Sequence, residues 1–289
     1  MKDQAEGLRH LVQTHQDRSI RQTRIITVTS GKGGVGKSNF TLNFALSLQA
    51  QGYKVLVFDA DIGLANIDVL MGVPSTYNLY HLLKREKTIW EIIQKGANGL
   101  EFIAGGSGFT DLLRLTEEEL NYFSEQIGEL NGYADFIIFD TGAGLSKETL
   151  QFILASEETI VVTTPEPTSI TDAYAIIKMV TSMGHQVSFK LVINRVTDAK
   201  EGRQTADKIS LVAHQFLDLQ IPTLGFIEDD AAVSKAVRKQ VPFSLAFPNS
   251  AAAGNIRAIS EAFVGGYRTS HTPSSGVKSF LNKMMRLLK

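Results

Sequence analysis

Eight consecutive residues near the start of the chain have the types and the spacing of a phosphate-binding loop. Residues 31–38 read GKGGVGKS and match the pattern G-x4-G-K-[ST]. Glycines let backbone N–H groups turn inward around phosphate oxygens, and a helix that starts here adds the partial positive charge of its N-terminus. Lys37 would reach the β- and γ-phosphates, and the Ser38 hydroxyl would bind Mg²⁺. The motif therefore predicts a nucleoside triphosphate site, against the alternative of a glycine-rich turn that only joins a strand to a helix.

The loop also has the context that this motif requires. Short runs rich in β-branched residues alternate with longer runs of helical period between residues 24 and 264. Strands are expected at 25–30, 55–59, 102–104, 136–140, 159–164, 190–194 and 223–227, and helices at 37–51, 117–130, 147–154, 169–182, 205–217, 231–239 and 252–263. This alternation predicts an α/β fold with a doubly wound, mostly parallel sheet and helices on both faces. Ligands of such folds bind at the carboxyl ends of the strands, so the functional residues should directly follow them.

Carboxylates stand where two of these expected strands end. Asp59 and Asp61 come at the end of the second strand, and Asp140 ends the fourth. A single aspartate in such a place is often only a helix N-cap or a turn residue. Acids after two strands that follow a phosphate-binding loop are a more specific signal. Together with the loop residues Gly31, Lys32, Gly33, Gly34, Val35, Gly36, Lys37, Ser38 and Asn39, they make up the expected nucleotide and magnesium site.

The composition limits the class of protein. Of 289 residues, 43% are hydrophobic and the formal net charge is −1, which excludes disorder as the main state and a protein that uniformly coats nucleic acid. Cysteine is absent, which excludes disulfides, Fe–S clusters and Cys-ligated zinc and fits a reducing compartment. The first 24 residues are too polar for a signal peptide, and no run approaches the ~18 apolar residues of a spanning helix. We therefore expect a cytoplasmic protein.

The end of the chain, residues 277–289, has an amphipathic pattern. At about 100° per residue one arc holds only apolar side chains, those of Val277, Phe280, Leu281, Met284, Met285, Leu287 and Leu288. Lysines and arginines occupy the opposite arc without any acid, which is typical of a helix that lies on anionic lipid. Such a helix is about 20 Å long, too short to span a bilayer. The alternative is a helix docked on the body, and both hold if the nucleotide state decides between them.

A second lysine in the loop carries a resemblance to a known family. The form KGGVGKS of residues 32–38 resembles the deviant Walker A motif of the MinD/ParA branch of the SIMIBI class of P-loop ATPases. In that family the early lysine, here Lys32, crosses a dimer interface to the partner's nucleotide, so that ATP binding and dimerisation are coupled. The resemblance implies ATP and Mg²⁺ as ligands and a homodimer with ATP bound. With Lys37 and Asp61, Lys32 is an expected catalytic residue.

Two further segments resemble the switch regions of this family. Residues 58–66 (FDADIGLAN) resemble switch I, which implies that Asp61 orients the attacking water and that Asp59 lies near Mg²⁺. Residues 139–144 (FDTGAG) resemble switch II, which implies that Asp140 holds the Mg²⁺ shell and that Gly142 lies near the γ-phosphate. Many relatives have proline where positions 141 and 142 stand, so this part of switch II departs from the family pattern.

The choice of base and the dimer face follow from the same resemblance. Asn194 and Arg195 end a strand where MinD-like relatives contact adenine, and the guanine signature NKxD fails because position 197 is threonine, so ATP is favoured over GTP. Glu166, in a Pro-Glu-Pro loop, and Asp172 match positions at the dimer face, where the acid reaches the partner's ribose. The alternative for that loop is an ordinary strand-to-helix connector.

The segment before the first strand narrows the resemblance. Residues 3–9 read DQAEGLR and resemble the DQAxxLR segment of the FlhG family (also called YlxH or FleN), MinD-like ATPases that control flagellar number and placement. In that family the segment stimulates the SRP-type GTPase FlhF, which implies a partner-activating role for Asp3, Gln4, Leu8 and Arg9. Flagellar switch (C-ring) proteins are implied as further partners. The alternative is a frayed polar terminus.

These interpretations divide the chain into a partner-activating segment (1–23), an ATPase domain (24–264), a flexible linker (265–276) and a membrane-targeting helix (277–289). The expected function is that of an ATP-dependent dimer, cytoplasmic and peripherally bound to the inner face of the cell membrane, that regulates flagella. The alternatives are a MinD-type division-site ATPase and a ParA-type partition ATPase that binds DNA. The amphipathic end of the chain argues against DNA as the partner.

Overall fold

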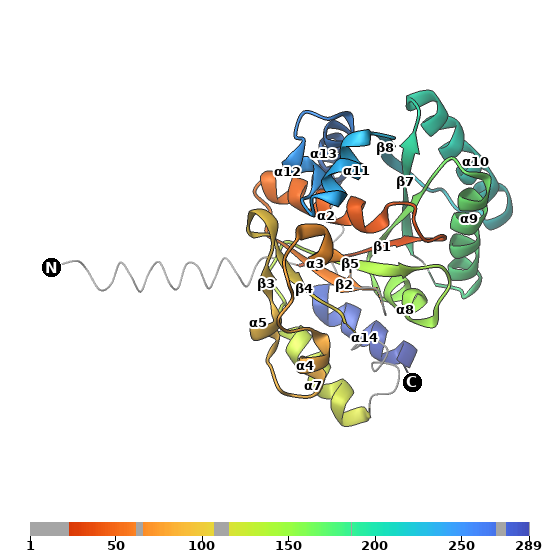
Figure 1. Ribbon diagram of the computed structural model, residues 1–289. Coiled ribbons are helices and arrows are strands. Elements are labelled where there is room, and N and C mark those ends of the chain that lie inside the picture. The colour runs from red at the N-terminus through yellow and green to blue at the C-terminus, as the bar shows by residue number, and fades with distance from the viewer. Residues whose placement is uncertain (1–22, 62–65, 107–115, 186, 270–275, 289) are drawn as a thin grey trace.

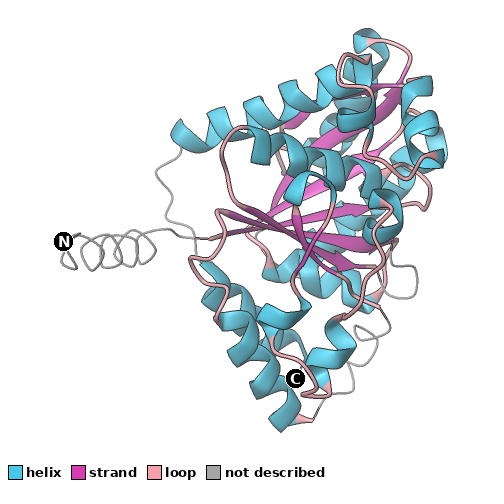
Figure 2. Ribbon diagram, turned by 60° about the vertical axis from the view of Figure 1, so that its left-hand side comes forward, coloured by secondary structure: helices cyan, strands magenta, loops and turns pink. Residues whose placement is uncertain are grey.

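The computed structural model describes residues 23–61, 66–106, 116–185, 187–269 and 276–288. They form one sheet with helices on both faces, which confirms the predicted fold class (Figures 1 and 2). The strands are β1 (Arg24–Ser30), β2 (Val55–Ala60), β3 (Gln94–Lys95), β4 (Glu101–Ile103), β5 (Phe136–Ala143), β6 (Glu158–Thr163), β7 (Ser188–Val196) and β8 (Thr223–Glu228). Their order across the sheet is β3-β4-β2-β5-β1-β6-β7-β8, and every neighbouring pair is parallel except β3 and β4.

The helices cover both faces because the central strands are apolar on both sides. In β1, for example, Ile26 packs into the cluster built with α2 (Lys37–Ala50) and α13 (Ala251–Thr269), whereas its neighbour Ile25 packs into the opposite cluster. That second cluster is built with α7 (Glu117–Gly128), α8 (Lys147–Ala155) and α14 (Gly276–Leu288). The remaining helices are α3 (Ile67–Met71), α4 (Leu79–Leu83), α5 (Ile89–Ile92), α9 (Pro167–Ser182), α10 (Ala199–Leu217), α11 (Ala231–Arg238) and α12 (Phe243–Ala246).

The expected linker differs from what the structure shows. Helix α13 continues to Thr269 and α14 begins at Gly276, so residues 265–269 of the predicted 265–276 linker are helical. Buried side chains at helical spacing, among them Ile259 and Phe263, hold this helix against the sheet. The glycines at 265 and 266 each cost only about 1 kcal/mol relative to alanine, which such packing offsets.

Helix α14 lies on the body with its apolar face covered. Val277, Phe280, Leu281 and Met284 are each at most 6% exposed, and the Phe280 ring stacks on that of Phe139 with centroids 4.9 Å apart. Each such burial contributes about 1.5–3 kcal/mol relative to exposure. Backbone contacts fix both ends of the helix, since the Gly276 N–H donates to Glu157 Oε1 at 2.9 Å and the Leu287 carbonyl accepts from Gln151 at 3.2 Å.

The docked position is the alternative that the amphipathic pattern left open beside lipid binding. In this conformation the apolar arc faces α7, α8 and β1 rather than solvent, because the aromatic side chains beneath it offer a matching apolar surface. Met285 is half-buried, and nothing is described of the Leu288 side chain. The basic residues Lys278, Lys283 and Arg286 remain exposed. The sequence pattern identified the apolar face correctly but not what covers it.

Candidate nucleotide-binding site

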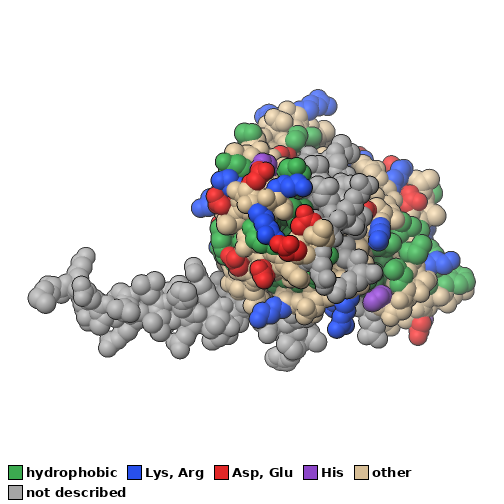
Figure 3. All heavy atoms as spheres, turned by 90° about the horizontal axis from the view of Figure 1, so that it is seen from below, with side chains coloured by type: hydrophobic (Ala, Val, Ile, Leu, Met, Phe, Trp, Pro, Cys, Tyr) green, Lys and Arg blue, Asp and Glu red, His purple; other side chains and the backbone are tan. Residues whose placement is uncertain are grey.

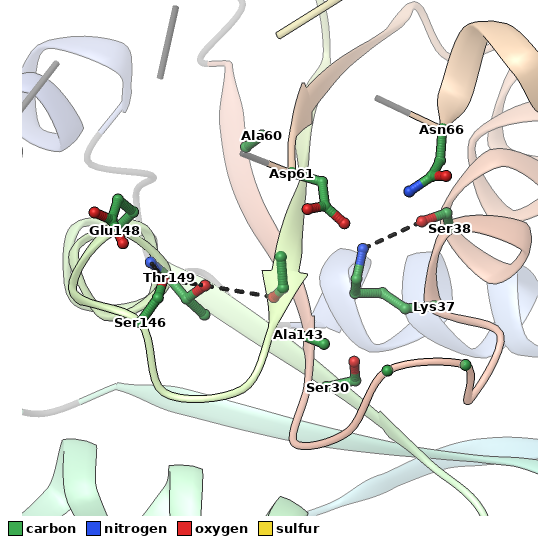
Figure 4. Close-up of a pocket in the computed structure, with 13 residues that line it drawn as sticks. Ser30, Lys37, Ser38, Ala60, Asp61, Asn66, Ala143, Ser146, Glu148 and Thr149 are labelled. Carbon is green, nitrogen blue, oxygen red and sulfur yellow. Dashed lines mark hydrogen bonds between the residues drawn. The ribbon is translucent and has the colours of Figure 1, made fainter. Parts of the chain in front are cut away.

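A cavity of about 490 Å³ opens where β1, β2 and β5 end (Figure 4). These are the carboxyl ends of parallel strands, where ligands of this architecture bind. Its lining contains the expected residues Gly33, Gly34, Lys37, Ser38, Asp61 and Gly142. It also contains residues that the sequence analysis did not select, namely Ser30, Ala60, Asn66, Ala143, Ser146, Glu148 and Thr149. Ser30, Ala60 and Ala143 are the last residues of β1, β2 and β5, so their position at a strand end was the available signal.

The loop of residues 31–38 wraps one wall of this cavity. Gly34 and Gly36 have φ values of 81° and 92°, in the left-handed region that favours glycine, and α2 starts directly after them at Lys37. Among the described residues no side chain caps this helix, so its first N–H groups are available to an anion. Gly31 is required for another reason, since a Cβ there would lie 2.2 Å from the backbone of Asp172 in α9. The local geometry is that of a phosphate cradle.

Lys37 lines the cavity and forms a buried ion pair with Asp140, which lies behind the lining. Its Nζ lies 3.0 Å from Asp140 Oδ1 and donates to Ser38 Oγ at 3.2 Å. The Thr41 hydroxyl donates to the same Asp140 oxygen at 2.6 Å. The second oxygen, Oδ2, is buried and has no hydrogen-bond partner among the described residues. An orphaned carboxylate oxygen beside a serine hydroxyl fits a divalent cation that prefers oxygen ligands.

Asp59 lies on the neighbouring strand, directly opposite Asp140 in the pairing of β2 with β5. It is 1% exposed, and its carboxylate accepts three backbone hydrogen bonds, from the N–H groups of Asp61, Asn66 and Ile67. Burial, together with the negative charge of Asp140, raises the pKa of the Asp59 carboxyl to about 7, although the three N–H groups lower it. The two strand-end acids thus have different surroundings: Asp140 faces Lys37, and Asp59 faces the backbone of switch I.

Asp61 lines the cavity on the side of Lys37 and Ser38 (Figure 4). A Cβ on Gly142 would lie 3.4 Å from Asp61 Oδ1, so the two switch segments meet here. Partial burial raises the pKa of the Asp61 carboxyl, the positive charge of Lys37 lowers it, and Asp140 raises it again. The structure therefore brings together the expected switch residues around one space.

Lys32 points out of the cavity, although it belongs to the same loop. Its Nζ lies 3.0 Å from Glu166 Oε2 and donates to Thr168 Oγ1 at 3.1 Å. The Lys32 and Glu166 side chains are 42% and 58% exposed, and this hydrogen bond lowers the pKa of the Glu166 carboxyl. Glu166 is the N-cap residue of α9, and Asp172 lies between one and two turns further along that helix, beside Gly31. The residues expected at a dimer face thus share one exposed rim.

The expected base-binding residues lie at the other end of the loop. Asn194 in β7 donates from Nδ2 to the Val35 carbonyl at 2.7 Å and so ties the strand to the loop. Arg195, with a φ of 57°, lines a second cavity of about 670 Å³ together with Asn39. That cavity is also lined by residues after β8 that the sequence analysis did not select: Asp229, Asp230, Ala231, Val233, Ser234, Val237 and Arg238. Asp229 and Asp230 lie between β8 and α11, and two acids in such a position were the sequence signal for this cavity.

Comparison with known proteins agrees with this geometry. Residues 26–243 match the family model described as the CobQ/CobB/MinD/ParA nucleotide binding domain. Over its full length the chain is 39% identical to the full-length flagellum site-determining protein YlxH of Helicobacter pylori. It is 31% identical to the antiactivator FleN of Pseudomonas aeruginosa, over 93% of this chain and 95% of FleN. The chain belongs to the MinD/ParA family, in the branch of YlxH and FleN.

A solved structure supports the assignment of this MinD/ParA protein. The septum site-determining protein MinD of Pyrococcus horikoshii, solved with Mg-ADP, superposes with a TM-score of 0.69 at 25% identity, over 86% of this chain and 99% of MinD. The predicted family and fold are therefore confirmed, and the protein is an ATPase of this family. Among the described helices, none is long and apolar enough to cross a membrane. The residues expected to activate a partner, Asp3, Gln4, Leu8 and Arg9, lie outside the described residues.

Proposed function

We propose that this protein is an ATP-dependent dimerisation switch that regulates the number and placement of flagella. The observation that carries the proposal is the different placement of two lysines of one loop. Lys37 is buried inside the cavity, where it can hold phosphate, whereas Lys32 stands exposed on the rim beside Glu166 and Thr168. A lysine on the rim is placed to reach a nucleotide held by a second copy. The name of the relative YlxH, a flagellum site-determining protein, supports the flagellar role.

The cavity would take the phosphates of Mg·ATP. The N–H groups of the loop and of the first turn of α2 would bind phosphate oxygens, and Lys37 would turn from Asp140 towards the β- and γ-phosphates. Ser38 and Asp140 would hold Mg²⁺, because the buried Asp140 Oδ2 has no other partner among the described residues. When bound, the cation would neutralise charge that develops on the phosphates. Asp61, half-buried at the edge of this space, would orient the attacking water.

The base would lie in the second cavity, and the partner would cover the rim. Asn39, Arg195 and the segment after β8 line a space beside the loop, which Asn194 fixes to β7. Thr197 stands where recognition of guanine requires an aspartate, which favours ATP. On the rim, the Lys32 side chain would leave Glu166 and contact the partner's nucleotide. Glu166 and Asp172 would face the partner chain. Gly142, beside Asp61, would sense the γ-phosphate.

Helix α14 would add a membrane contact to this switch. Its buried apolar arc cannot bind lipid while it lies on α7 and α8, so we propose that the ATP-bound dimer releases it. Lys278, Lys283 and Arg286 are exposed and would then face anionic headgroups. Two released helices on one dimer bind more strongly than one, because the second contact is intramolecular. On the face of the body shown in Figure 3, basic and acidic side chains are interspersed, so the described atoms there form no patch of one sign.

The N-terminal segment, residues 1–23, would act on an SRP-type GTPase of the FlhF kind, with Asp3, Gln4, Leu8 and Arg9 as the contacting residues. This part of the proposal rests on the sequence DQAEGLR and on the full-length similarity to YlxH. Flagellar switch proteins are the further partners proposed from the same similarity. Stimulation of GTP hydrolysis by a peptide of residues 1–23, lost when Gln4 is replaced by alanine, would support this role.

The experiment for the switch itself measures mass in solution and binding to liposomes. We expect a monomer with ADP or without nucleotide, a dimer with ATP, and no dimer with GTP. Sedimentation with anionic liposomes should increase with ATP, fall at high salt because the basic face is screened, and fall when the exposed Lys278, Lys283 and Arg286 are replaced by glutamine. A monomer with ATP under all conditions would contradict the proposal, as would liposome binding that depends on neither nucleotide nor salt.

A further inference from the structure

The two acids that end β2 and β5 differ in what their oxygen atoms contact. Asp140 keeps one buried oxygen without a hydrogen-bond partner among the described residues. Asp59, its partner in the strand pairing, uses both oxygens: Oδ1 accepts from the Asp61 N–H at 3.2 Å, and Oδ2 accepts from the Asn66 and Ile67 N–H groups at 2.8 and 3.1 Å. Oδ2 accepts two N–H groups and has little capacity left for a cation, and Oδ1 already accepts one N–H group. Asp140 can therefore offer an oxygen atom to a metal ion, whereas Asp59 accepts hydrogen bonds from the backbone with both of its oxygens.

The three N–H groups come from both ends of one segment. Asp61 directly follows β2, and Asn66 and Ile67 form the start of α3, so a single carboxylate joins the two ends of switch I. The Asn66 side chain makes no capping hydrogen bond at the start of this helix, which leaves the first N–H groups to Asp59. Ile67 is fully buried in the core, so this end of the segment is fixed to the body. We call the three hydrogen bonds of Asp59 to the two ends of the segment the clamp.

The clamp also holds residues of the nucleotide-binding cavity. Asp61 and Asn66, whose N–H groups Asp59 holds, both line the nucleotide cavity near Lys37 and Ser38 (Figure 4). Displacement of a group at an active site by about 1 Å can cost about 100-fold in rate. A carboxylate that fixes both ends of the segment thus sets where the proposed water-orienting group stands.

We propose that Asp59 is a positioning residue that clamps switch I through the backbone of Asp61, Asn66 and Ile67, and that it is not a ligand of Mg²⁺. This rests on the proposed role of Asp61 and replaces the expectation that Asp59 belongs to the metal shell. Loss of the clamp impairs catalysis while the phosphate cradle and the metal-binding oxygen of Asp140 stay in place.

The test compares Asp59→Asn with Asp140→Asn. The Asn amide has only one acceptor oxygen, so the three hydrogen bonds, which use both oxygens of Asp59, cannot all be kept. For Asp59→Asn we expect amide hydrogen exchange at residues 61, 66 and 67 of the nucleotide-free protein to become about tenfold faster. The kcat for ATP should fall by about 10- to 100-fold, with the Mg²⁺ concentration for half-maximal activity unchanged. Asp140→Asn should instead raise that Mg²⁺ concentration and leave exchange at residues 66 and 67 unchanged.

A matched control is Asp68→Asn in α3, which makes the same change of charge one residue beyond the clamp and should alter neither exchange at 66 and 67 nor kcat. A raised Mg²⁺ requirement in Asp59→Asn would overturn the proposal, as would faster exchange with an unchanged kcat. If Asp59→Asn does not fold, exchange in the wild type decides: protection of the Asn66 and Ile67 N–H groups supports the clamp, and exchange at the rate of an unstructured peptide overturns it. Failure of the wild type to dimerise would contradict the proposed switch, but amide exchange of the nucleotide-free protein would still test the hydrogen bonds of Asp59.

Discussion

The inner wall and the outer rim of the phosphate-binding loop differ in how firmly each holds its lysine. On the inner wall, Lys37 and Asp140 are 6% and 0% exposed and belong to a connected set of hydrogen bonds with Ser38 and Thr41. On the rim, Lys32 and Glu166 form an ion pair that water surrounds. Buried pairs are costly to break, whereas exposed pairs are weak and screened by salt. The difference supports the proposal that Lys37 serves the chain's own nucleotide, and the exposed pair of Lys32 with Glu166 can be broken at little cost.

The largest effect is expected when the ion pair of the inner wall is removed. Lys37→Ala removes the charge that faces the phosphates and leaves Asp140 without its ion pair, so nucleotide binding should be lost. Isothermal titration calorimetry with ATP measures this directly. Lys32→Ala is the matched control, because it removes the same charge from the same loop but from the rim, and the monomer should still bind ATP. Equal loss of binding in both variants would remove the distinction between wall and rim.

A smaller effect separates binding from chemistry within the inner wall. Asp61→Ala should bind Mg·ATP normally but hydrolyse it about 100- to 10,000-fold more slowly, because the phosphate cradle remains and the water is no longer held. The variant should accumulate as a dimer with ATP. Single-turnover hydrolysis and light scattering provide the two measurements. Normal turnover would exclude Asp61 from the mechanism.

On the rim, the expected effect is confined to assembly. Lys32→Ala should shift the ATP-dependent monomer–dimer equilibrium towards monomer while the affinity of the monomer for ATP stays near that of the wild type. Analytical ultracentrifugation at several protein concentrations measures this equilibrium. An unchanged dimer would show that Lys32 is only a solvated loop lysine.

The smallest effect concerns the rim in the absence of nucleotide. Glu166→Gln removes the acidic partner of Lys32, but an exposed ion pair contributes little, so the thermal unfolding midpoint of the nucleotide-free protein should not change measurably. With ATP the same variant should dimerise less well. A clearly lowered midpoint without nucleotide would mean that the rim contact is structural rather than exchangeable.

The sequence was sufficient to predict the wall of the site because that wall is locally encoded. The glycines of residues 31–38, the helix after them and the acids at two strand ends each follow from short-range patterns. The short helices between residues 67 and 92 were not predicted, because elements of four or five residues are held by tertiary packing rather than by their own propensity. Helix α10 begins at Ala199 instead of 205 because the Asp198 side chain caps it, a signal that was present but not used.

The surface that covers the apolar face of a helix could not be predicted from the periodicity of its sequence. The pattern in residues 277–289 identified the apolar arc of α14, but lipid and the body both satisfy such an arc, and only the aromatic surface of Phe139 and Phe152 shows where it docks. The clamp by Asp59 is similar, because its three partners depend on how switch I returns to the core at Ile67. Pattern predicts which groups are available, and tertiary structure decides what they contact.

The central claim is that Lys32 acts on the nucleotide of the partner chain, and a mixed dimer tests it most directly. Lys32→Ala and Asp61→Ala should each hydrolyse ATP poorly alone. In a mixture, the nucleotide of the Lys32→Ala chain is served by its own Asp61 and by the intact Lys32 of the other chain, so we predict hydrolysis well above the sum of the two separate variants. If Lys32 acts on its own nucleotide, every site in the mixture lacks one of the two groups, and activity equal to that sum would contradict the account.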